Sequence, residues 1–316
     1  MLHRLQPLPS VRHSLSRRSL QLAAALLGAP AIQRLLTRHT LGRYYNYTFA
    51  HPDRYSAQSY KLLRHTFSQA ELESLQAYQQ ELKLHDSECS PIIIGRLHKW
   101  AYTRELVRSR GQRMELPVEE ATTPEAVQMV AVVSGSYLTL DEREAIGALG
   151  HMVTHELSRK GQGHGTALYQ AFEQELRDQA KKHHRRLRLI VLESQPDARF
   201  FWAKQGFRCL EGVHYVQPPL DFDPHTGQPL GEAVAEHLMV KLCSENPSAE
   251  ERIDQTVLKR AVFALYKHWY VPEMTTFDTA ARERVKTFVL EEVFGTFLAS
   301  LPTQEAPILL FDPTFR

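Results

Sequence analysis

The sequence predicts an α/β or α+β domain in which a sheet is flanked by helices, with helical segments at both ends of the chain. Three observations lead to this fold class. Between about residues 121 and 244, short apolar runs typical of strands alternate with runs of helical period. On either side of this region, apolar residues are spaced mainly as in helices. Hydrophobic residues make up 43% of the 316 residues, which excludes a collagen, a membrane bundle and a wholly disordered chain.

Residues 1–52 differ in composition from the rest of the chain. They contain seven arginines and four serines but no Asp, Glu or Lys. The whole chain has a net charge of +2, so subtracting these seven positive charges leaves the remainder at −5. An Arg-rich, Ser-containing, acid-free leader is typical of a mitochondrial transit peptide. We therefore expect residues 1–52 to be a targeting segment for the mitochondrial matrix.

Two other interpretations of residues 1–52 remain open. The pair Arg17-Arg18, followed by an apolar run ending in Ala29-Pro30-Ala31, is also similar to a twin-arginine export signal with its cleavage site. The segment could equally be an N-terminal structural arm. Its apolar stretch is only about 11 residues long, which is too short to span a bilayer, so no transmembrane segment is expected.

Residues 53–120 are mostly polar and helical in pattern. Ser68 and Glu71 form a capping box that predicts a helix over residues 70–84. The apolar residues between 91 and 107 fit a helix or a strand equally well. This part either completes the first elements of the sheet domain or forms a separate helical cap.

Residues 121–244 carry the predicted sheet domain. We expect two strands, 127–133 and 137–140, joined near Gly135, and a third strand over residues 146–155. A glycine-rich turn then opens a helix in which Leu168, Phe172 and Leu176 share one face. The elements expected after it are a strand at 187–192, a helix at 196–205, and strands at 207–216 and 236–242.

Residues 245–316 are helical in pattern again. Apolar stripes run from Ile253 to Trp269 and from Val285 to Phe297, with a break at Pro272. We interpret this part as a C-terminal helical extension that packs on the core or on a partner.

The turn from Lys160 to Gly165 has the composition of a phosphate-binding loop. Glycines let backbone N–H groups face an anion, and the start of the following helix adds a favourable dipole. A P-loop would need a Gly-Lys-Ser/Thr sequence, but Gly165 is followed by Thr166-Ala167. A dinucleotide fingerprint starting at Gly161 would need glycine at position 166. Both common nucleotide-binding motifs are therefore excluded here.

The pattern Lys160-x-x-Gly163-x-Gly165 instead resembles the R/Q-x-x-G-x-G/A motif of the GNAT superfamily of acyl-CoA-dependent N-acyltransferases. The segment Phe200 to Phe207 is similar to that family's F-Y-x-K-x-G-F, and Tyr215 to Leu220 is similar to a segment of some bacterial-type members. The resemblance covers roughly Val127 to Leu242. It implies a splayed mixed β-sheet, with acetyl-CoA between strands 146–155 and 187–192. The residues that it implies for acetyl-CoA binding are Val153, His155, Lys160, Gly161, Gln162, Gly163, His164, Gly165, Thr166 and Trp202.

In that family the backbone N–H groups of the loop, here Gln162 to Thr166, hold the pyrophosphate, and the strand before it, here Val153 to His155, pairs with the pantetheine arm. The tyrosine that often protonates the departing thiolate is replaced by Trp202, whose indole N–H cannot deliver a proton in this way. Either another group acts as the acid, such as Tyr215 or water, or the thiolate leaves unaided, or no transfer takes place.

Acyl transfer to an amine also needs a base. The candidates on or beside the strand before the loop are Glu144, His151, His155 and Glu156. His151 is preferred, because imidazole titrates near neutral pH and lies mid-strand, where the family places its base; Glu156 is kept as a second catalytic candidate.

No metal site is expected. The three cysteines form no CxxC pair, and the sequence from His155 to Arg159 lacks the second histidine of HExxH.

We expect a mitochondrial N-acetyltransferase that transfers acetyl from acetyl-CoA to an unidentified primary amine. The alternative is a GNAT-fold subunit without catalysis that serves in a large mitochondrial assembly, such as a ribonucleoprotein. The basic run Lys181 to Arg186 fits such a partner, although a solvated helix end, where cations favour the dipole, is the preferred explanation. A third hypothesis is a CoA-binding regulator without transfer.

Overall fold

The computed structural model describes residues 42–49, 55–67, 72, 75, 78, 79, 88–100, 127–155, 162–243, 252–271, 277–303 and 306–315. The chain divides into two compact units. One comprises residues 1–47 and 96–130, and the other comprises residues 48–95 and 131–316. Of the predicted targeting segment 1–52, only residues 42–49 are described. Its residues 1–41 and 50–52, the second catalytic candidate Glu156, and Lys160 and Gly161 of the loop lie outside the described residues.

The first unit contains most of strand β1 (Gly42–Phe49), the end of β2 (Cys89–Trp100) and the beginning of β3 (Val127–Thr139). Arg96 Nη1 donates a hydrogen bond to Asn46 Oδ1 at 2.9 Å. The rings of Tyr44 and His98 stack with their centroids 4.6 Å apart. The apolar run at 91–107, which the sequence pattern left undecided, is therefore a strand up to residue 100.

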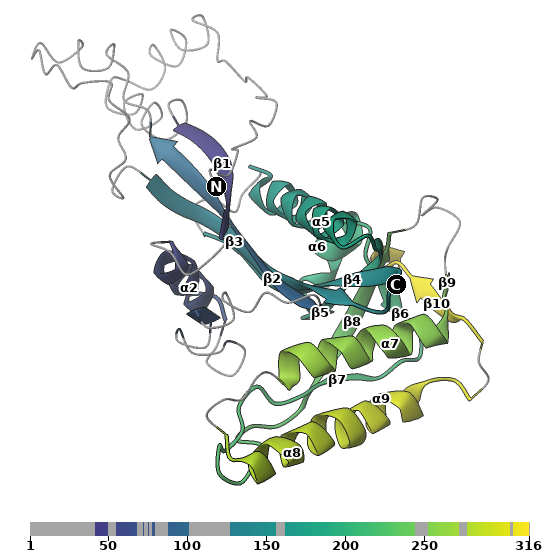
Figure 1. Cartoon of the computed structure of the whole chain (residues 1–316). Helices are drawn as coiled ribbons and strands as arrows, with labels where there is room; N and C mark the ends of the chain where they lie inside the picture. Colours follow the sequence, from purple (N-terminus) through teal and green to yellow (C-terminus); the bar gives the residue numbers. More distant parts are fainter. Residues whose placement is uncertain are drawn as a thin grey trace, which may run out of the picture. The chain divides into compact units, whose positions relative to one another are not determined.

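The sheet is mixed, with the strand order β1-β2-β3-β4-β5-β8-β6-β10-β9, and β7 also pairs with β8 (Figure 1). Strand β4 (Glu144–Thr154) is antiparallel to β3 and parallel to β5 (Arg186–Ser194). Strand β8 (Val234–Leu242) is antiparallel to β5 on one side and to β6 (Arg208–Leu210) and β7 (Tyr215–Gln217) on the other. The predicted fold class, a mixed sheet flanked by helices, is confirmed.

Side chains alternate between the two faces of the central strands, as strand geometry requires. One face packs against α5 (His164–Lys182) and α6 (Arg199–Lys204) in an apolar cluster that includes Leu149, Phe172 and Trp202. The other face packs against the C-terminal helices in a second cluster that includes Ala148 and Val191. Helix α2 (Ser56–Arg64) lies on the same side of the sheet as α7 (Figure 1).

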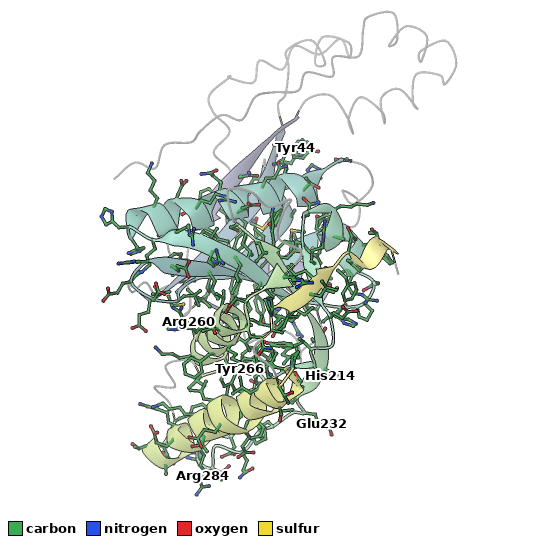
Figure 2. The ribbon with its side chains drawn as sticks, turned by 90° about the vertical axis from the view of Figure 1, so that its right-hand side faces the viewer. Tyr44, His214, Glu232, Arg260, Tyr266 and Arg284 are labelled. Atoms are coloured by element: carbon green, nitrogen blue, oxygen red, sulfur yellow. The ribbon has the colours of Figure 1, made fainter. Side chains whose placement is uncertain are left out.

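The C-terminal extension is built into the core. Helix α7 (Gln255–Leu265) begins at Asp254, whose carboxylate accepts hydrogen bonds from two backbone N–H groups of its first turn, and continues as a π-helical turn, Tyr266–Tyr270. Arg260 donates to the carbonyl of Leu140 at 3.0 Å, which joins α7 to the β3–β4 turn (Figure 2).

Helix α8 (Thr279–Thr287) passes through a second π-helical turn, Phe288–Val293, into α9 (Phe294–Ser300). The chain then returns to the sheet as β10 (Ile308–Phe311), between β6 and the short β9 (Arg252–Ile253), and ends the described part with a 3₁₀ turn, Pro313–Phe315. Among the described residues, no helix combines the length and apolar character that crossing a bilayer would require.

Two sequence predictions about strands are corrected. The segments 127–133 and 137–140 form one strand, β3, and not two. Gly135 lies inside it at a register shift, where an added Cβ would stand 2.3 Å from the carbonyl oxygen of Ala148. Glycine is needed there for close backbone approach and not for a turn. Conversely, the single strand expected at 207–216 is divided into β6 and β7, because Glu211 to His214 bow away from β8 between the two pairings.

Candidate active site

The parallel strands β4 and β5 stop pairing with each other part-way along their length. Their register ends at the pair Leu149–Leu192. Beyond it, β4 stays paired with β3 as far as Thr154, and β5 stays paired with β8 as far as Ser194. The edge of β4 that faced β5 is therefore released from strand pairing after Leu149, which is the geometry that an extended, amide-bearing ligand can use.

The glycine turn leads directly into α5. Gly163 is the N-terminal cap of the helix and has a left-handed backbone with φ of 67°, a conformation that favours glycine. Apart from its two chain neighbours, no atom of the described residues lies within 4 Å of the place of a Cβ there, so the described part of the chain leaves the space in front of the turn open. The N–H groups of the first helical turn have no partner within the helix and carry the positive end of its dipole. This end of α5 is suited to an anion.

The end of β4 and the start of α5 lie against each other. The side chain of Met152 approaches Gly165, with its Cε 3.6 Å from the place of a Cβ there. Val153 is buried and His155, which follows the strand, is partly exposed. The structure therefore brings together two parts of the predicted acetyl-CoA site, Val153 and His155 from β4 and the described part of the loop, Gln162 to Thr166.

Side-chain hydrogen bonds hold the loop in place. Gln162 Oε1 and His164 Nε2 are 2.8 Å apart, and His164 is buried while Gln162 is exposed. Gln205 at the end of α6 donates to Thr166 Oγ1 at 3.4 Å. The loop is thus joined to α6 as well as to β4.

Trp202 lies in the apolar cluster under α5. Its side chain is only 7% exposed, and its ring meets those of Phe207 and Tyr169 edge-on, with centroids 5.6 and 5.9 Å away. This packing gives Trp202 a structural role. Its predicted part in acetyl-CoA binding stays a prediction.

His151 lies on β4 just after the last β4–β5 pair. Its Nδ1 is 3.5 Å from Ser134 Oγ, and its ring meets Phe67 edge-on at 4.7 Å. It therefore stands where the sequence prediction put a base, on the strand segment that β5 no longer covers.

Glu193, which the sequence reasoning missed, is the most perturbed carboxylate of this region. It follows Leu192, the last β5 residue that pairs with β4, and it is partly exposed. Its Oε1 accepts a hydrogen bond from the hydroxyl of Tyr215, and Tyr270 donates to Oε1 and Oε2 at 2.8 and 2.7 Å. The available signal was an acid directly after an apolar strand. Its partners, however, lie 22 and 77 residues further along the chain.

The environment of Glu193 brings its pKa into the neutral range. Loss of hydration, the largest effect, raises the pKa to about 7, and the negative charge of Glu236 acts in the same direction. The two tyrosine hydroxyls oppose this by stabilising the carboxylate. Burial and the nearby Glu193 charge raise the pKa values of Tyr215 and Tyr270 well above the usual range, so both stay protonated donors.

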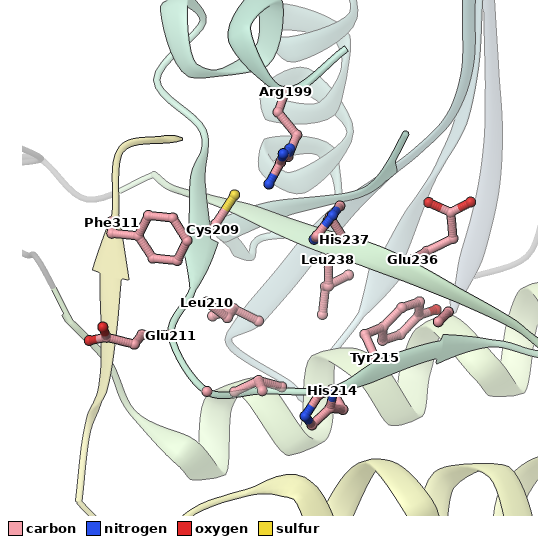
Figure 3. Close-up of a pocket in the computed structure, with 13 residues that line it drawn as sticks. Arg199, Cys209, Leu210, Glu211, His214, Tyr215, Glu236, His237, Leu238 and Phe311 are labelled. Carbon is pink, nitrogen blue, oxygen red and sulfur yellow. The ribbon is translucent and has the colours of Figure 1, made fainter. Parts of the chain in front are cut away.

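A pocket of about 450 Å³ opens next to this cluster, where the chain between β6 and β7 bows away from β8 (Figure 3). Tyr215 forms part of its wall. The other polar or reactive side chains around it include Arg199, Cys209, His214, Glu236 and His237. The volume suits a small molecule or a short side chain, and the wall carries charges of both signs.

A metal centre finds no support in the described part of the chain, where no three His, Cys, Asp or Glu side chains gather closely enough to hold an ion. The described side chains near this level that could carry proton transfer include Glu193, its two tyrosines, His151 and His155.

The decisive comparison is with families of known proteins. Residues 122–207 match the model of the acetyltransferase (GNAT) family. This confirms the resemblance inferred from the two motifs, and the matched segment runs from just before β3 to the end of the α6 region. A search of curated proteins found no match.

Solved structures of GNAT proteins also align with the chain, at low similarity. NAA60 of Arabidopsis thaliana, solved in complex with acetyl-CoA, is 11% identical with a TM-score of 0.41, over 64% of this chain and 99% of that one. An acetyltransferase from Streptococcus agalactiae is 18% identical with a TM-score of 0.34, over 64% and 98%. Ard1 of Thermoplasma volcanium is 15% identical with a TM-score of 0.36, over 65% and 100%. These neighbours leave the substrate of this chain open.

Proposed function

We propose that this GNAT-fold protein is an N-acetyltransferase that moves an acetyl group from acetyl-CoA to a primary amine. One observation carries the proposal. A carboxylate with a pKa of about 7, Glu193, is held by two hydroxyls at the level where β4 and β5 separate. The anion-suited turn at the start of α5 supports it, because a GNAT substrate needs a place for its phosphates.

Acetyl-CoA would bind along the released edge of β4. The N–H groups of Gln162 to Thr166 would face its pyrophosphate, and the backbone of Val153 to His155 would pair with the amides of the pantetheine arm. The open space in front of Gly163 fits this arrangement, since a bulky ligand must approach the turn without meeting a side chain. Lys160 and Gly161 belong to the same proposed site on the strength of the motif.

In the proposed reaction Glu193 takes a proton from the ammonium group of the acceptor. The freed nitrogen lone pair forms a bond to the acetyl carbonyl carbon, the carbon–sulfur bond breaks, and its electron pair leaves with the CoA sulfur. Glu193 then gives its proton to that sulfur, and the nitrogen loses a second proton to water as it becomes the amide, which closes the proton balance. A pKa near 7 suits a group that must accept and then release a proton close to neutral pH.

We further propose that the acceptor amine docks in the pocket of Figure 3. The pocket shares Tyr215 with the Glu193 cluster, and Glu236 gives its wall a negative charge that attracts an ammonium group. Tyr215, predicted as the proton donor for the thiolate, is in this scheme the residue that connects the pocket with the base. His151 remains the alternative base.

The test measures CoA release from acetyl-CoA in the presence of a panel of primary amines. We expect Glu193→Gln to lower kcat by about 100-fold or more, as for loss of a general base, with the affinity for acetyl-CoA unchanged. Glu291→Gln, which removes an exposed carboxylate of the second π-helical turn away from the pocket lining, is the matched control and should keep kcat. Ala235→Trp, which would fill the pocket, should raise the KM for the amine. Equal kcat values for wild type and Glu193→Gln would exclude Glu193 as the base.

The mitochondrial matrix is the location that we propose, on the composition of residues 1–52 alone. The alternative of a non-catalytic subunit predicts a folded chain that neither binds acetyl-CoA nor releases CoA, so the experiments here and at the end of the Discussion separate the two.

A further inference from the structure

We infer that the C-terminal extension is part of the active site, because its Tyr270 holds Glu193 in place as a positioning residue. This inference rests on the proposed function. Tyr270 lies 63 residues beyond the segment that matches the GNAT model, residues 122–207. The family match therefore assigns it no role.

Tyr270 fixes both the position and the rotation of the carboxylate. The residue is 4% exposed, and its hydroxyl oxygen is 2.8 Å from Glu193 Oε1 and 2.7 Å from Oε2. Tyr215 donates to Oε1. Oε1 therefore faces two hydroxyls and Oε2 only one of them, so that Oε2 keeps more of its capacity to accept a proton. The two tyrosines thus distinguish the two oxygens of the base.

The π-helical turn Tyr266–Tyr270 explains how one helix end reaches several strands at once. The Tyr266 hydroxyl donates to the carbonyl oxygen of Val216 on β7, and Figure 2 shows this tyrosine between the sheet and the last helix. Trp269 Nε1 donates to Ser136 Oγ on β3 at 3.1 Å, and its ring lies 3.3 Å from the place of a Cβ on Gly150.

Gly150 is the residue of β4 that the register shift skips, directly after the last β4–β5 pair. The turn therefore contacts both strands at the level where they separate, through Trp269 on β4 and Tyr270 on β5. Single π-helical turns are found frequently at functional sites. These contacts indicate that the C-terminal extension fixes the positions of β4 and β5 where the two strands separate, in addition to covering the sheet.

Three groups act on the charge of Glu193, from three elements packed around it. Tyr215 on β7 and Tyr270 on the π-helical turn stabilise the carboxylate, and Glu236 on β8 repels it. Tyr266 lies behind them, with its ring 5.7 Å from Tyr215 and 5.8 Å from Tyr270. Removing the Tyr270 hydroxyl takes away one of two stabilising donors while the repulsion stays, so Glu193 should bind its proton at higher pH.

The experiment compares urea unfolding of wild type, Tyr270→Phe, Glu193→Gln and the double variant from pH 5 to pH 9. The difference between chains with and without Glu193 gives the midpoint of its titration. We expect Tyr270→Phe to raise that midpoint by about one to two pH units, the size that a hydrogen bond to a charged group predicts. Tyr169→Phe, which removes a buried hydroxyl under α5 on the other face of the sheet, should leave it unchanged. An unchanged midpoint in Tyr270→Phe would overturn the inference.

A second variant covers the case in which Tyr270→Phe fails to fold. Incorporation of 3-fluorotyrosine at position 270 keeps the ring and makes the hydroxyl a stronger donor, so the midpoint should move in the opposite direction, to lower pH. No movement would assign Tyr270 to packing alone. The acid limb of amine acetylation should follow the same shifts. A wild type without acetyl transfer would refute the proposed function, while the unfolding data would still decide whether Tyr270 controls Glu193.

Discussion

At the scale of single residues, the surroundings of Glu193 disfavour its charged form. An acid at the end of a buried strand loses hydration, and two tyrosine hydroxyls compensate for only part of that loss, since its pKa stays at about 7. The tyrosines come from β7 and from the π-helical turn, which are brought to β5 only by the folded sheet. A carboxylate kept in this state near neutral pH is typical of functional sites.

This pKa has a consequence for stability. An unfolded Glu has a pKa of about 4.3, below that of Glu193 in the folded chain, so the folded state binds the proton more tightly. Its contribution to stability is present at low pH and is lost as the pH rises from about 4.3 through 7. Between pH 5 and pH 8 the wild type should therefore lose on the order of 3 kcal/mol more free energy of unfolding than Glu193→Gln. Parallel pH curves from urea unfolding would contradict this.

At the scale of elements, β3 and β4 come into close contact at Gly135. This glycine pairs with Leu149, the last β4 residue that pairs with β5. A Cβ at position 135 would stand 2.3 Å from the carbonyl oxygen of Ala148 and 2.6 Å from the ring of Phe172. The backbone of β4 cannot move away without disturbing its pairing with β3. The ring of Phe172 belongs to the apolar cluster between α5 and the sheet, so it cannot move freely either. The geometry of the site therefore depends on the register shift at this glycine.

Gly135→Ala should lower the free energy of unfolding by about 3 kcal/mol or more, because it overpacks a buried strand. Gly295→Ala is the matched control, since a Cβ there, on α9, would meet no atom of the residues that the structure describes within 4 Å. It should raise stability by about 0.5–1 kcal/mol, because alanine is the better helix former. Similar effects of both substitutions in urea unfolding would show that the β3–β4 contact is looser than described.

The sequence predicted those elements whose signals are local. The period of Leu168, Phe172 and Leu176 indicated α5, and the apolar run 187–192 indicated β5, which the structure extends by one residue before and two after. It also located the end of β4 and the glycine turn as neighbours through the GNAT motif. Features set by distant pairing escaped it, namely the return of the chain as β10, the two π-helical turns and the split of β6 from β7.

The candidate site shows the same division. His151 and the described part of the glycine turn lie where the motif indicated. Glu193 did not stand out, because its unusual state depends on Tyr215 and Tyr270, whose distances no periodicity reveals. A strand that ends in an acid is common, and only its burial against hydroxyls distinguishes this one.

At the scale of the whole molecule, elements outside residues 122–207, the segment that matches the GNAT model, complete the sheet. Strand β8 pairs along β5, and the C-terminal helices cover the face of the sheet on which Glu193 meets its tyrosines. We propose that this assembly binds acetyl-CoA at the start of α5 and transfers its acetyl group.

The most direct measurement is a calorimetric titration of the full chain with acetyl-CoA, alongside Gly163→Glu and Gly212→Glu. Both glycines have a left-handed backbone, with φ of 67° and 69°, and at both the described residues leave room for a Cβ, so both substitutions carry a similar backbone strain. Only the first places a carboxylate where the phosphates should lie. We predict saturable binding by wild type and Gly212→Glu, and loss of binding by Gly163→Glu. A folded wild type that binds no acetyl-CoA would contradict the proposed acetyl-CoA site and would favour the non-catalytic subunit.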